Sequence, residues 1–269
     1  MLDLSAVTDD IVIHRLDEAL ICSTSQLADR ERILGATRTC ADRFSFSNTR
    51  TYPRPDHPDP AKRRSLFFLL AAIIVSLRTT LENEQLAMSR LMARAESDAA
   101  LLSLSVDELE SLIRPAGMGR QKAERISASL HTLSSLPNGV DSLLEMPAPV
   151  ARDFLLSLPG VGPKAADCLL TIGLGIPSMV VDVNVYRASS WILVGSSGGR
   201  NFNDPRDVRR IKDRLDSALA GEDAFLYQIV HTLLLLLGKS MSRSGHVVER
   251  CVGAEHCQYC SDQVALRLV

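Results

Sequence analysis

Apolar residues recur along most of the chain at the three- and four-residue spacing of helices, and no stretch alternates as a half-buried strand does. Residues 66–75 are apolar on every side, which predicts a buried helix that Ser65 caps and that extends to about Leu77. Near the N-terminus an amphipathic helix is predicted from four apolar positions, Ile11, Ile13, Leu16 and Leu20. The pattern therefore favours an all-α fold.

The same spacing predicts further helices with turn residues between them. Ser105 and Glu108 have the spacing of a capping box at the start of one helix. Residues 38–62 are polar and contain four prolines, which predicts an extended linker. The other helices are expected over residues 82–95, 105–113, 120–130, 149–156, 164–172, 184–193, 204–219 and 223–238.

The composition limits the class of protein. With 269 residues, 46% of them hydrophobic, the chain can bury a core in one large or two smaller domains. Its 30 basic and 32 acidic residues do not favour nucleic-acid binding over the whole surface, but they permit a local basic face. The longest apolar run is too short for a bilayer, and the N-terminus lacks the order of a signal peptide. We expect a cytoplasmic, nucleoid-associated protein, or a nuclear one if eukaryotic, without a membrane partner.

A glycine-rich turn between two predicted helices is the most specific local signal: Leu158, Pro159, Gly160, Val161 and Gly162. The proline fixes φ, and the glycines permit conformations that other residues resist. A second proline after the turn can begin the next helix, because a first-turn proline loses no helical hydrogen bond. Free N–H groups at such a turn suit a phosphate oxygen, so this helix-hairpin-helix is expected to bind a nucleic-acid backbone without reading its sequence.

Two residues follow this turn at chemically suggestive positions. Lys164 lies in the first turn of the second helix, and Asp182 follows an apolar run where the next helix should start. The motif LPGVGPK and the later segment PSMVVDVNVYR together resemble the endonuclease III family, the helix-hairpin-helix, Gly/Pro-Asp glycosylases of DNA repair. The resemblance extends over about residues 66–238. It implies that Lys164 is the nucleophile and Asp182 its essential partner.

The resemblance also implies an architecture, two helical domains that flank a DNA-binding cleft. Residues 83–175 would form the helical block with the helix-hairpin-helix, and residues 63–82 and 176–240 would form the terminal-segment domain. Residues 1–62 would be an N-terminal helix with the proline-rich linker, and residues 241–269 a cysteine-containing tail. Lys164 and Asp182 would face each other across the cleft mouth.

The implied chemistry requires that the damaged nucleotide leave the base stack, at a cost of a few kcal/mol. The neutral amine of Lys164 would displace the base from the sugar, and the resulting Schiff base would permit strand cleavage by β-elimination. A helix N-terminus and partial burial both favour the neutral amine, and position 164 is expected to offer both. Asp182 would stabilise positive charge on the sugar. The alternatives are a phosphate-binding lysine and a plain N-cap, and capping is compatible with catalysis.

Further DNA contacts are expected from two segments. Arg78 follows the buried helix where the family places a wedge that fills the gap in the stack, and the alternative is an ordinary arginine at a helix end. The segment from Gly117 to Lys122 resembles the family's second backbone-binding loop. Its members Gly117 and Gly119 would shape the loop, while Arg120 and Lys122 would neutralise phosphates or form a solvated basic turn.

The tail departs from the family pattern, in which four cysteines often hold a 4Fe–4S cluster. Only Cys251, Cys257 and Cys260 are present, and the fourth cysteine expected near Leu266 is missing. Three interpretations stay open: a loop without metal, a cluster with a non-cysteine fourth ligand, and a zinc site that recruits His246 or His256. None of the three supplies a cofactor that the glycosylase chemistry needs.

The sequence as a whole predicts a monomeric base-excision-repair DNA glycosylase with AP-lyase activity. Its partner would be double-stranded DNA with a damaged base or an abasic site, and the excised base would be a pyrimidine. Asn184 replaces the histidine commonest at that position in the family, which weakens any assignment of the base. The alternative is a non-catalytic DNA-damage-binding protein. A monofunctional glycosylase that uses water is a third, against which Lys164 argues.

Overall fold

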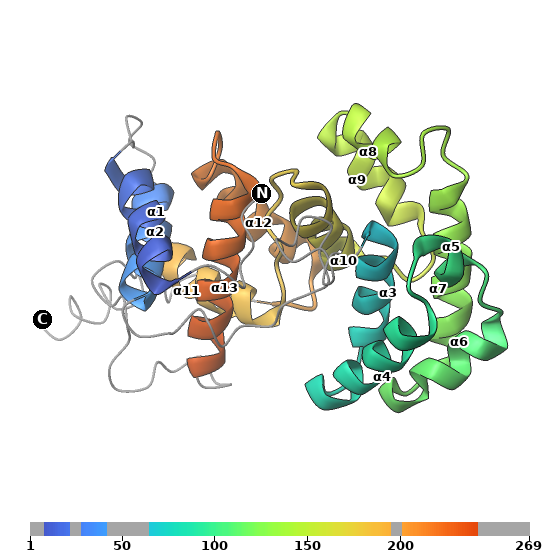
Figure 1. Cartoon of the computed structure of the whole chain (residues 1–269). Helices are drawn as coiled ribbons and strands as arrows, with labels where there is room; N and C mark the ends of the chain where they lie inside the picture. Colours follow the sequence, from blue (N-terminus) through green and yellow to red (C-terminus); the bar gives the residue numbers. More distant parts are fainter. Residues whose placement is uncertain (1–7, 22–27, 42–64, 195–200, 242–269) are drawn as a thin grey trace, which may run out of the picture. The chain divides into compact units, whose positions relative to one another are not determined.

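Helices are the only regular elements in the part of the chain that the structure describes, and no strand occurs there. The computed structural model describes residues 8–21, 28–41, 65–194 and 201–241 (Figure 1). They fall into two units, one of residues 51–176 and one of residues 1–50 and 177–269. The predicted all-α fold class is confirmed.

The unit of residues 51–176 is built around α3 (Leu66–Ser76). All residues from 66 to 75 are buried, and the helix packs against α4, α5, α7 and η4. Each large apolar side chain buried there contributes about 1.5–3 kcal/mol. The other elements are α4 (Leu81–Arg94), α5 (Asp98–Leu102), α6 (Val106–Ile113), η3 (Arg114–Ala116), α7 (Gly119–Ser134), α8 (Asp141–Glu145), α9 (Ala148–Ser157), α10 (Pro163–Cys168) and η4 (Leu169–Leu174).

Capping residues start several of these helices where the sequence predicts them. The Ser65 hydroxyl accepts a hydrogen bond from the backbone N–H of Phe67, and Ser105 and Glu108 form the full capping box of α6. The short helices α5 and α8 were not predicted, because five residues carry too little periodicity.

Two predictions for this unit are wrong in detail. The helix expected over residues 164–172 divides into α10 and the π-helical turn η4, whose Gly173 lies so close to Leu66 that a Cβ there would collide with the leucine side chain. Residues 63–82 were assigned to the terminal-segment domain. They belong instead with residues 51–176, because the apolar surface of α3 is covered by α4, α7 and η4.

The other unit draws its helices from both ends of the chain, in blue and in yellow to red in Figure 1. These are α1 (Asp9–Ile21), α2 (Ala28–Ala41), α11 (Val183–Val194), α12 (Pro205–Ala218) and α13 (Ala224–Ser240). Their buried apolar side chains form one core to which all five helices contribute. The predicted amphipathic helix is α1, with Leu16 in the core and Ile11 exposed.

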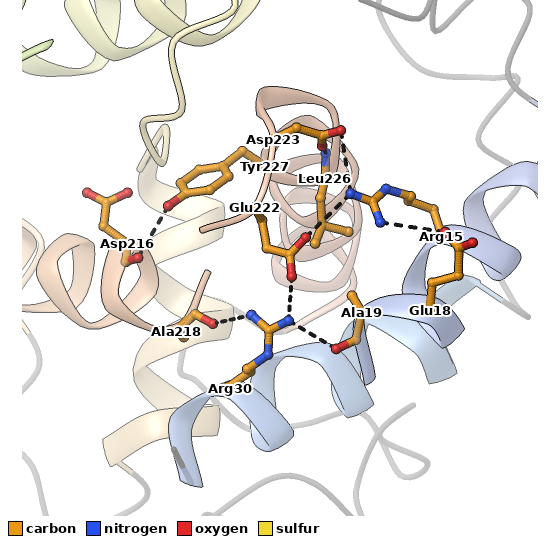
Figure 2. A network of polar contacts seen from close by, with 10 residues as sticks. All are labelled: Arg15, Glu18, Ala19, Arg30, Asp216, Ala218, Glu222, Asp223, Leu226 and Tyr227. Carbon is orange, nitrogen blue, oxygen red and sulfur yellow. Dashed lines mark hydrogen bonds and ion pairs between the residues drawn. The ribbon is translucent and has the colours of Figure 1, made fainter. Parts of the chain in front are cut away.

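Helix α2 was missed, and its last turn occupies residues that were expected to start the linker. Its first turn looks solvated because it is rich in charge, yet Arg30 is buried. The guanidinium donates to Ala218 O and Ala19 O, both at 3.0 Å, and to Glu222 Oε1 at 2.5 Å (Figure 2). Arg15 also pairs with Glu222, at 3.4 Å. These partners come from distant parts of the chain, which is why local periodicity did not reveal the helix.

Two predicted segments lie outside the described residues: the linker from residue 42 to 62 and the cysteine tail from residue 242. Among the described helices, none has both the length and the apolar character needed to cross a membrane.

Candidate functional site

A tight turn joins α9 to α10 and forms the predicted helix-hairpin-helix. The backbone N–H of Val161 donates to Leu158 O at 3.0 Å, and Gly160 has a φ of 86°. Leu158 and Val161 are buried, so the two apolar residues of the turn fix it to the unit of residues 51–176. The positive φ explains the glycine at position 160.

Helix α7 holds this hairpin from one side. The Ser129 hydroxyl donates to Pro159 O at 2.9 Å, and a Cβ on Gly160 would lie 2.9 Å from Arg125 Cδ. Gly162 is different, because its backbone is extended and a Cβ there would have no protein atom within 4 Å. The open side of the turn is therefore at Gly162, where a ligand could approach the backbone.

Lys164 is the second residue of α10 and follows Gly162, at the open side of the hairpin, by two residues. Its side chain is exposed, and no hydrogen bond or ion pair from the described residues engages its amine. The expected start of a helix is confirmed, whereas the expected partial burial is wrong. Helix α10 is tied to α9 by the buried Asp167, which accepts from Arg152 Nε at 2.8 Å and from Nη2 at 3.3 Å.

Asp182 caps α11 in the unit of residues 177–269. Its Oδ1 accepts hydrogen bonds from the backbone N–H groups of Asn184 and Val185, both at 2.8 Å. Because Oδ1 makes both of these bonds, the cap leaves Oδ2 for another partner. The predicted N-cap is present and is compatible with a second role.

The segment before Asp182 is held by side chains from α12 and α13. Asp216 Oδ1 accepts from the N–H of Met179 at 2.8 Å, and Lys212 bonds both Met179 O at 3.2 Å and Asp216 Oδ2 at 2.7 Å. His231 Nδ1 lies 2.8 Å from Val180 O. His231 therefore serves as a hydrogen-bonded structural histidine. Sequence reasoning missed Lys212 and Asp216, which carry no motif.

The first turn of α11 lies against the end of α13. Arg187 Nη1 donates to Asn184 Oδ1 at 3.1 Å and to Gly238 O at 2.7 Å. A Cβ on Gly238 would collide with the backbone of Asn184, so a glycine is required at this close approach. The amide of Asn184 is thus oriented by Arg187.

Arg78 occupies the turn between α3 and α4. It is exposed and has a φ of 51°, which is strained for a residue with a side chain. Among the described residues only Met118 shares this feature, with a φ of 52°. The Arg78 side chain is thus exposed just beyond the end of α3, a helix whose residues 66–75 are all buried.

Met118 lies in the second predicted loop, between η3 and α7, next to Gly117 with a φ of 71°. No side chain caps α7 there, so its first N–H groups are free of side-chain partners. Arg120 is exposed on the first turn and pairs with three carboxylates, those of Asp107, Glu110 and Glu124. Its expected phosphate contact would compete with these pairs.

The prediction that Lys122 neutralises a phosphate is wrong. The residue is 1% exposed, and its Nζ donates to Val75 O and to Ala116 O, both at 2.9 Å. Burial lowers the pKa of Lys122, and the nearby Glu84 carboxylate opposes that shift. The fourth residue of α7 faces the protein interior because α7 packs against α3.

The predicted ligands Cys251, Cys257 and Cys260 lie outside the described residues. Within them, Cys40 and Cys168 are buried, and no cluster of three or more metal-ligating side chains occurs.

A family model matches the part of the chain that contains the hairpin and the Asp182 cap. The model of the HhH-GPD superfamily of base excision DNA repair proteins matches residues 71–211, just over half of the chain. This chain belongs to the HhH-GPD superfamily. The match spans both Lys164 and Asp182, as the resemblance in the sequence implied.

Relatives in the superfamily include endonuclease III from several bacteria. The Haemophilus influenzae enzyme is 29% identical over 185 residues, which are 68% of this chain and 80% of the relative. The Treponema pallidum enzyme is 34% identical over 147 residues, 55% of this chain and 64% of the relative. The Escherichia coli K12 enzyme is 26% identical over 212 residues, 77% and 91% respectively.

Solved structures show the same fold at low sequence identity. A trapped covalent intermediate of endonuclease III with DNA has a TM-score of 0.61 and 23% identity, over 87% of this chain and 98% of that chain. A thermostable thymine-DNA glycosylase has a TM-score of 0.64 and 17% identity, over 87% and 97%. Superfamily and relatives together bear out the predicted enzyme class, a DNA glycosylase and AP lyase of base excision repair.

Proposed function

We propose that this HhH-GPD protein excises a damaged or modified pyrimidine from double-stranded DNA through a Schiff base on Lys164. The observation that carries the proposal is the exposed amine of Lys164. It lies on the first turn of α10, two residues after Gly162 at the open side of the hairpin. A backbone phosphate bound at that turn would bring the deoxyribose of a neighbouring nucleotide within reach of the amine.

The reaction follows from the chemistry of a neutral amine at that position. Lys164 Nζ attacks C1′ of the extruded nucleotide, the bond from C1′ to the base breaks, and the base leaves with the electron pair and takes up a proton. Loss of the amine proton and opening of the sugar ring give the Schiff base. Removal of a C2′ proton then expels the 3′ phosphate by β-elimination, and water releases the enzyme. Because Lys164 is exposed in the free protein, its desolvation would come from the bound nucleotide.

Asp182 is proposed to stabilise the positive charge that develops on the sugar. Its Oδ1 is held by two backbone N–H groups, which fixes the carboxylate and directs Oδ2 away from the cap. The segment in front of it is bonded to Asp216, Lys212 and His231, so the carboxylate is preorganised rather than mobile.

The DNA contacts proposed for the unit of residues 51–176 come from three turns. The hairpin of residues 158–162 and the loop at Gly117 and Gly119 would bind backbone phosphates, with Arg120 released from its carboxylates in the complex. Arg78 would fill the gap that the extruded base leaves. Its strained, exposed turn supports this role, because strain of this kind concentrates at functional sites.

No step of this chemistry requires a metal. The tail does not match the family's usual 4Fe–4S donor set, because its three cysteines lack the fourth expected near Leu266. Anaerobically purified protein is therefore expected to be colourless and low in iron. Stoichiometric iron and sulfide would make the tail cysteines cluster ligands, and stoichiometric zinc would favour the site with His246 or His256. We further propose that the protein acts as a monomer in the cytoplasm at the nucleoid, or in the nucleus if eukaryotic.

The deciding experiment is borohydride trapping. Purified protein is incubated with an abasic-site duplex and reductant, and a covalent adduct of one protein per strand is expected. The Lys164→Gln variant is the matched control, because it keeps the side chain polar and removes the amine. Binding of abasic DNA without any adduct in the parent would identify the non-catalytic damage-binding protein instead.

A further inference from the structure

The geometry points to Lys122 as a positioning residue that joins the Arg78 turn to the Gly117–Met118–Gly119 loop and sets the wedge for DNA. Its buried ammonium bonds one carbonyl just before each of these two turns, Val75 O near the end of α3 and Ala116 O at the end of η3. The inference rests on the proposed function, since it takes Arg78 as the residue that enters the base stack.

The two carbonyls are ones that helix geometry leaves without partners. Val75 lies one residue before the end of α3, and Ala116 is the last residue of η3. The last carbonyls of a helix lack intrahelical N–H donors and carry partial negative charge. A side chain on the fourth residue of α7 leans toward the start of that helix, so Lys122 reaches both carbonyls at once.

The turns that Lys122 joins contain both strained positions of the described chain. Arg78 follows Val75 by three residues, and Met118 follows Ala116 by two. Neither residue is a glycine, and each needs surrounding structure to keep a positive φ. The shared ammonium supplies that support from inside, while both side chains stay exposed.

The charge of Lys122 is balanced locally. Glu84, on the first turn of α4, is itself buried, and it attracts the Lys122 ammonium. Helix α4 begins just after the Arg78 turn and packs against η3. The two carbonyls therefore share one cation at the base of both turns, the Glu84 carboxylate favours its charged form, and loss of the cation would release both turns.

The test measures the base stack directly. An abasic-site duplex carries 2-aminopurine opposite the abasic site, and its fluorescence on binding is compared for the parent, Arg78→Ala, Lys122→Met and the double variant. We expect Lys122→Met to reproduce the altered signal of Arg78→Ala and to weaken duplex binding about tenfold, the size of a typical coupled pair. The double variant should be no worse than either single variant, because both remove the same wedge.

Two controls separate the wedge from folding and from the chemistry. Ile126→Ala removes a fully buried side chain from the same helix, one turn further on, and should leave the fluorescence signal as in the parent. Single-stranded abasic DNA has no stack to wedge, so Lys122→Met should be trapped on it by borohydride as the parent is. A parent that is not trapped on either substrate contradicts the proposed function and not the positioning role.

Three results would overturn the inference. The first is a parent-like fluorescence signal in Lys122→Met, and the second is an equal loss of trapping on single and double strands. The third is a failure to fold of both Lys122→Met and the double variant Lys122→Met with Glu84→Gln. The double variant is included because it removes the Glu84 charge together with the charge of the lysine. If neither variant folds, Lys122 serves the fold as a whole and the specific link between the turns is wrong.

Discussion

Two lysines follow glycine-rich loops at the start of helices, and the protein places them in opposite environments. Lys164, the second residue of α10, is exposed behind the hairpin, whereas Lys122, the fourth residue of α7, is 1% exposed and bonded to two backbone carbonyls. In sequence both follow a Gly-x-Gly turn. The difference teaches that the position within the first helical turn decides whether an amine faces solvent or the neighbouring helix.

The comparison is tested most strongly by removing each amine. Lys164→Gln should abolish strand cleavage and borohydride trapping while DNA affinity stays close to the parent's, because glutamine cannot form the Schiff base. Lys122→Met should keep trapping on single-stranded abasic DNA. The measurement is the adduct seen on a denaturing gel. An adduct with Lys164→Gln would mean that another amine is the nucleophile and that the contrast between the two lysines is not a catalytic one.

The next largest effect is expected at Asp182. Asp182→Asn keeps an oxygen that can accept from Asn184 and Val185 but loses the charge, so base release should fall by orders of magnitude. Stability should change by only about 1 kcal/mol, the size of a capping effect. Single-turnover base release and urea unfolding measure the two quantities.

Asp204→Asn is the matched control, because Asp204 caps α12 in the same unit through the N–H of Arg206. Asp204→Asn should lower the free energy of unfolding by an amount similar to Asp182→Asn, while the rate of base release stays that of the parent. Equal activity of Asp182→Asn and the parent would reduce Asp182 to a cap.

The contrast between the two lysines also shows which features of the protein could be predicted from its sequence. The hairpin was predictable because a proline and two glycines specify it within five residues, and Ser65 and Asp182 were predictable as caps for the same local reason. The burial of Lys122 depends on α7 packing against α3, and the helix around Arg30 depends on acceptors from α1 and the end of α12. Contacts between residues far apart in the chain leave no local pattern, so these two were missed.

The two hairpin glycines should separate folding from DNA binding. The Cβ of Gly162→Val would have no protein atom within 4 Å, and the backbone there is extended, so the fold should be kept. Affinity should fall about tenfold for damaged and undamaged duplex alike, because a backbone contact carries no base information. Gly160→Ala should instead destabilise the protein by about 1 kcal/mol or more, since φ is 86° and the Cβ would lie 2.9 Å from Arg125 Cδ.

Fluorescence anisotropy with both duplexes and urea unfolding distinguish these outcomes. A loss of affinity confined to damaged DNA in Gly162→Val would place this glycine at the base pocket rather than at the backbone. A stable Gly160→Ala variant would show that the turn tolerates another conformation.

The smallest expected effect is the contribution of the buried Lys122 to the pH dependence of stability. Burial lowers the pKa of Lys122 in the folded protein below its ordinary value of 10.5. Between the two values the unfolded chain holds a proton at Lys122 that the folded chain has lost, so this contribution to stability rises with pH, by at most about 1.4 kcal/mol per pH unit. Below that window, where the lysine is protonated in both states, the contribution is flat.

The measurement is the free energy of unfolding in urea for the parent minus that of Lys122→Met, from neutral pH upward. The difference should increase as the pH approaches 10.5. Ile126→Val changes a residue on the same face of α7 without changing a titrating group. The free energy of unfolding of the parent minus that of Ile126→Val should therefore not change with pH. A flat difference for Lys122→Met as well would mean that Glu84 and the two carbonyls compensate the burial of the ammonium completely, so that this lysine is as easily protonated in the folded protein as in the unfolded chain.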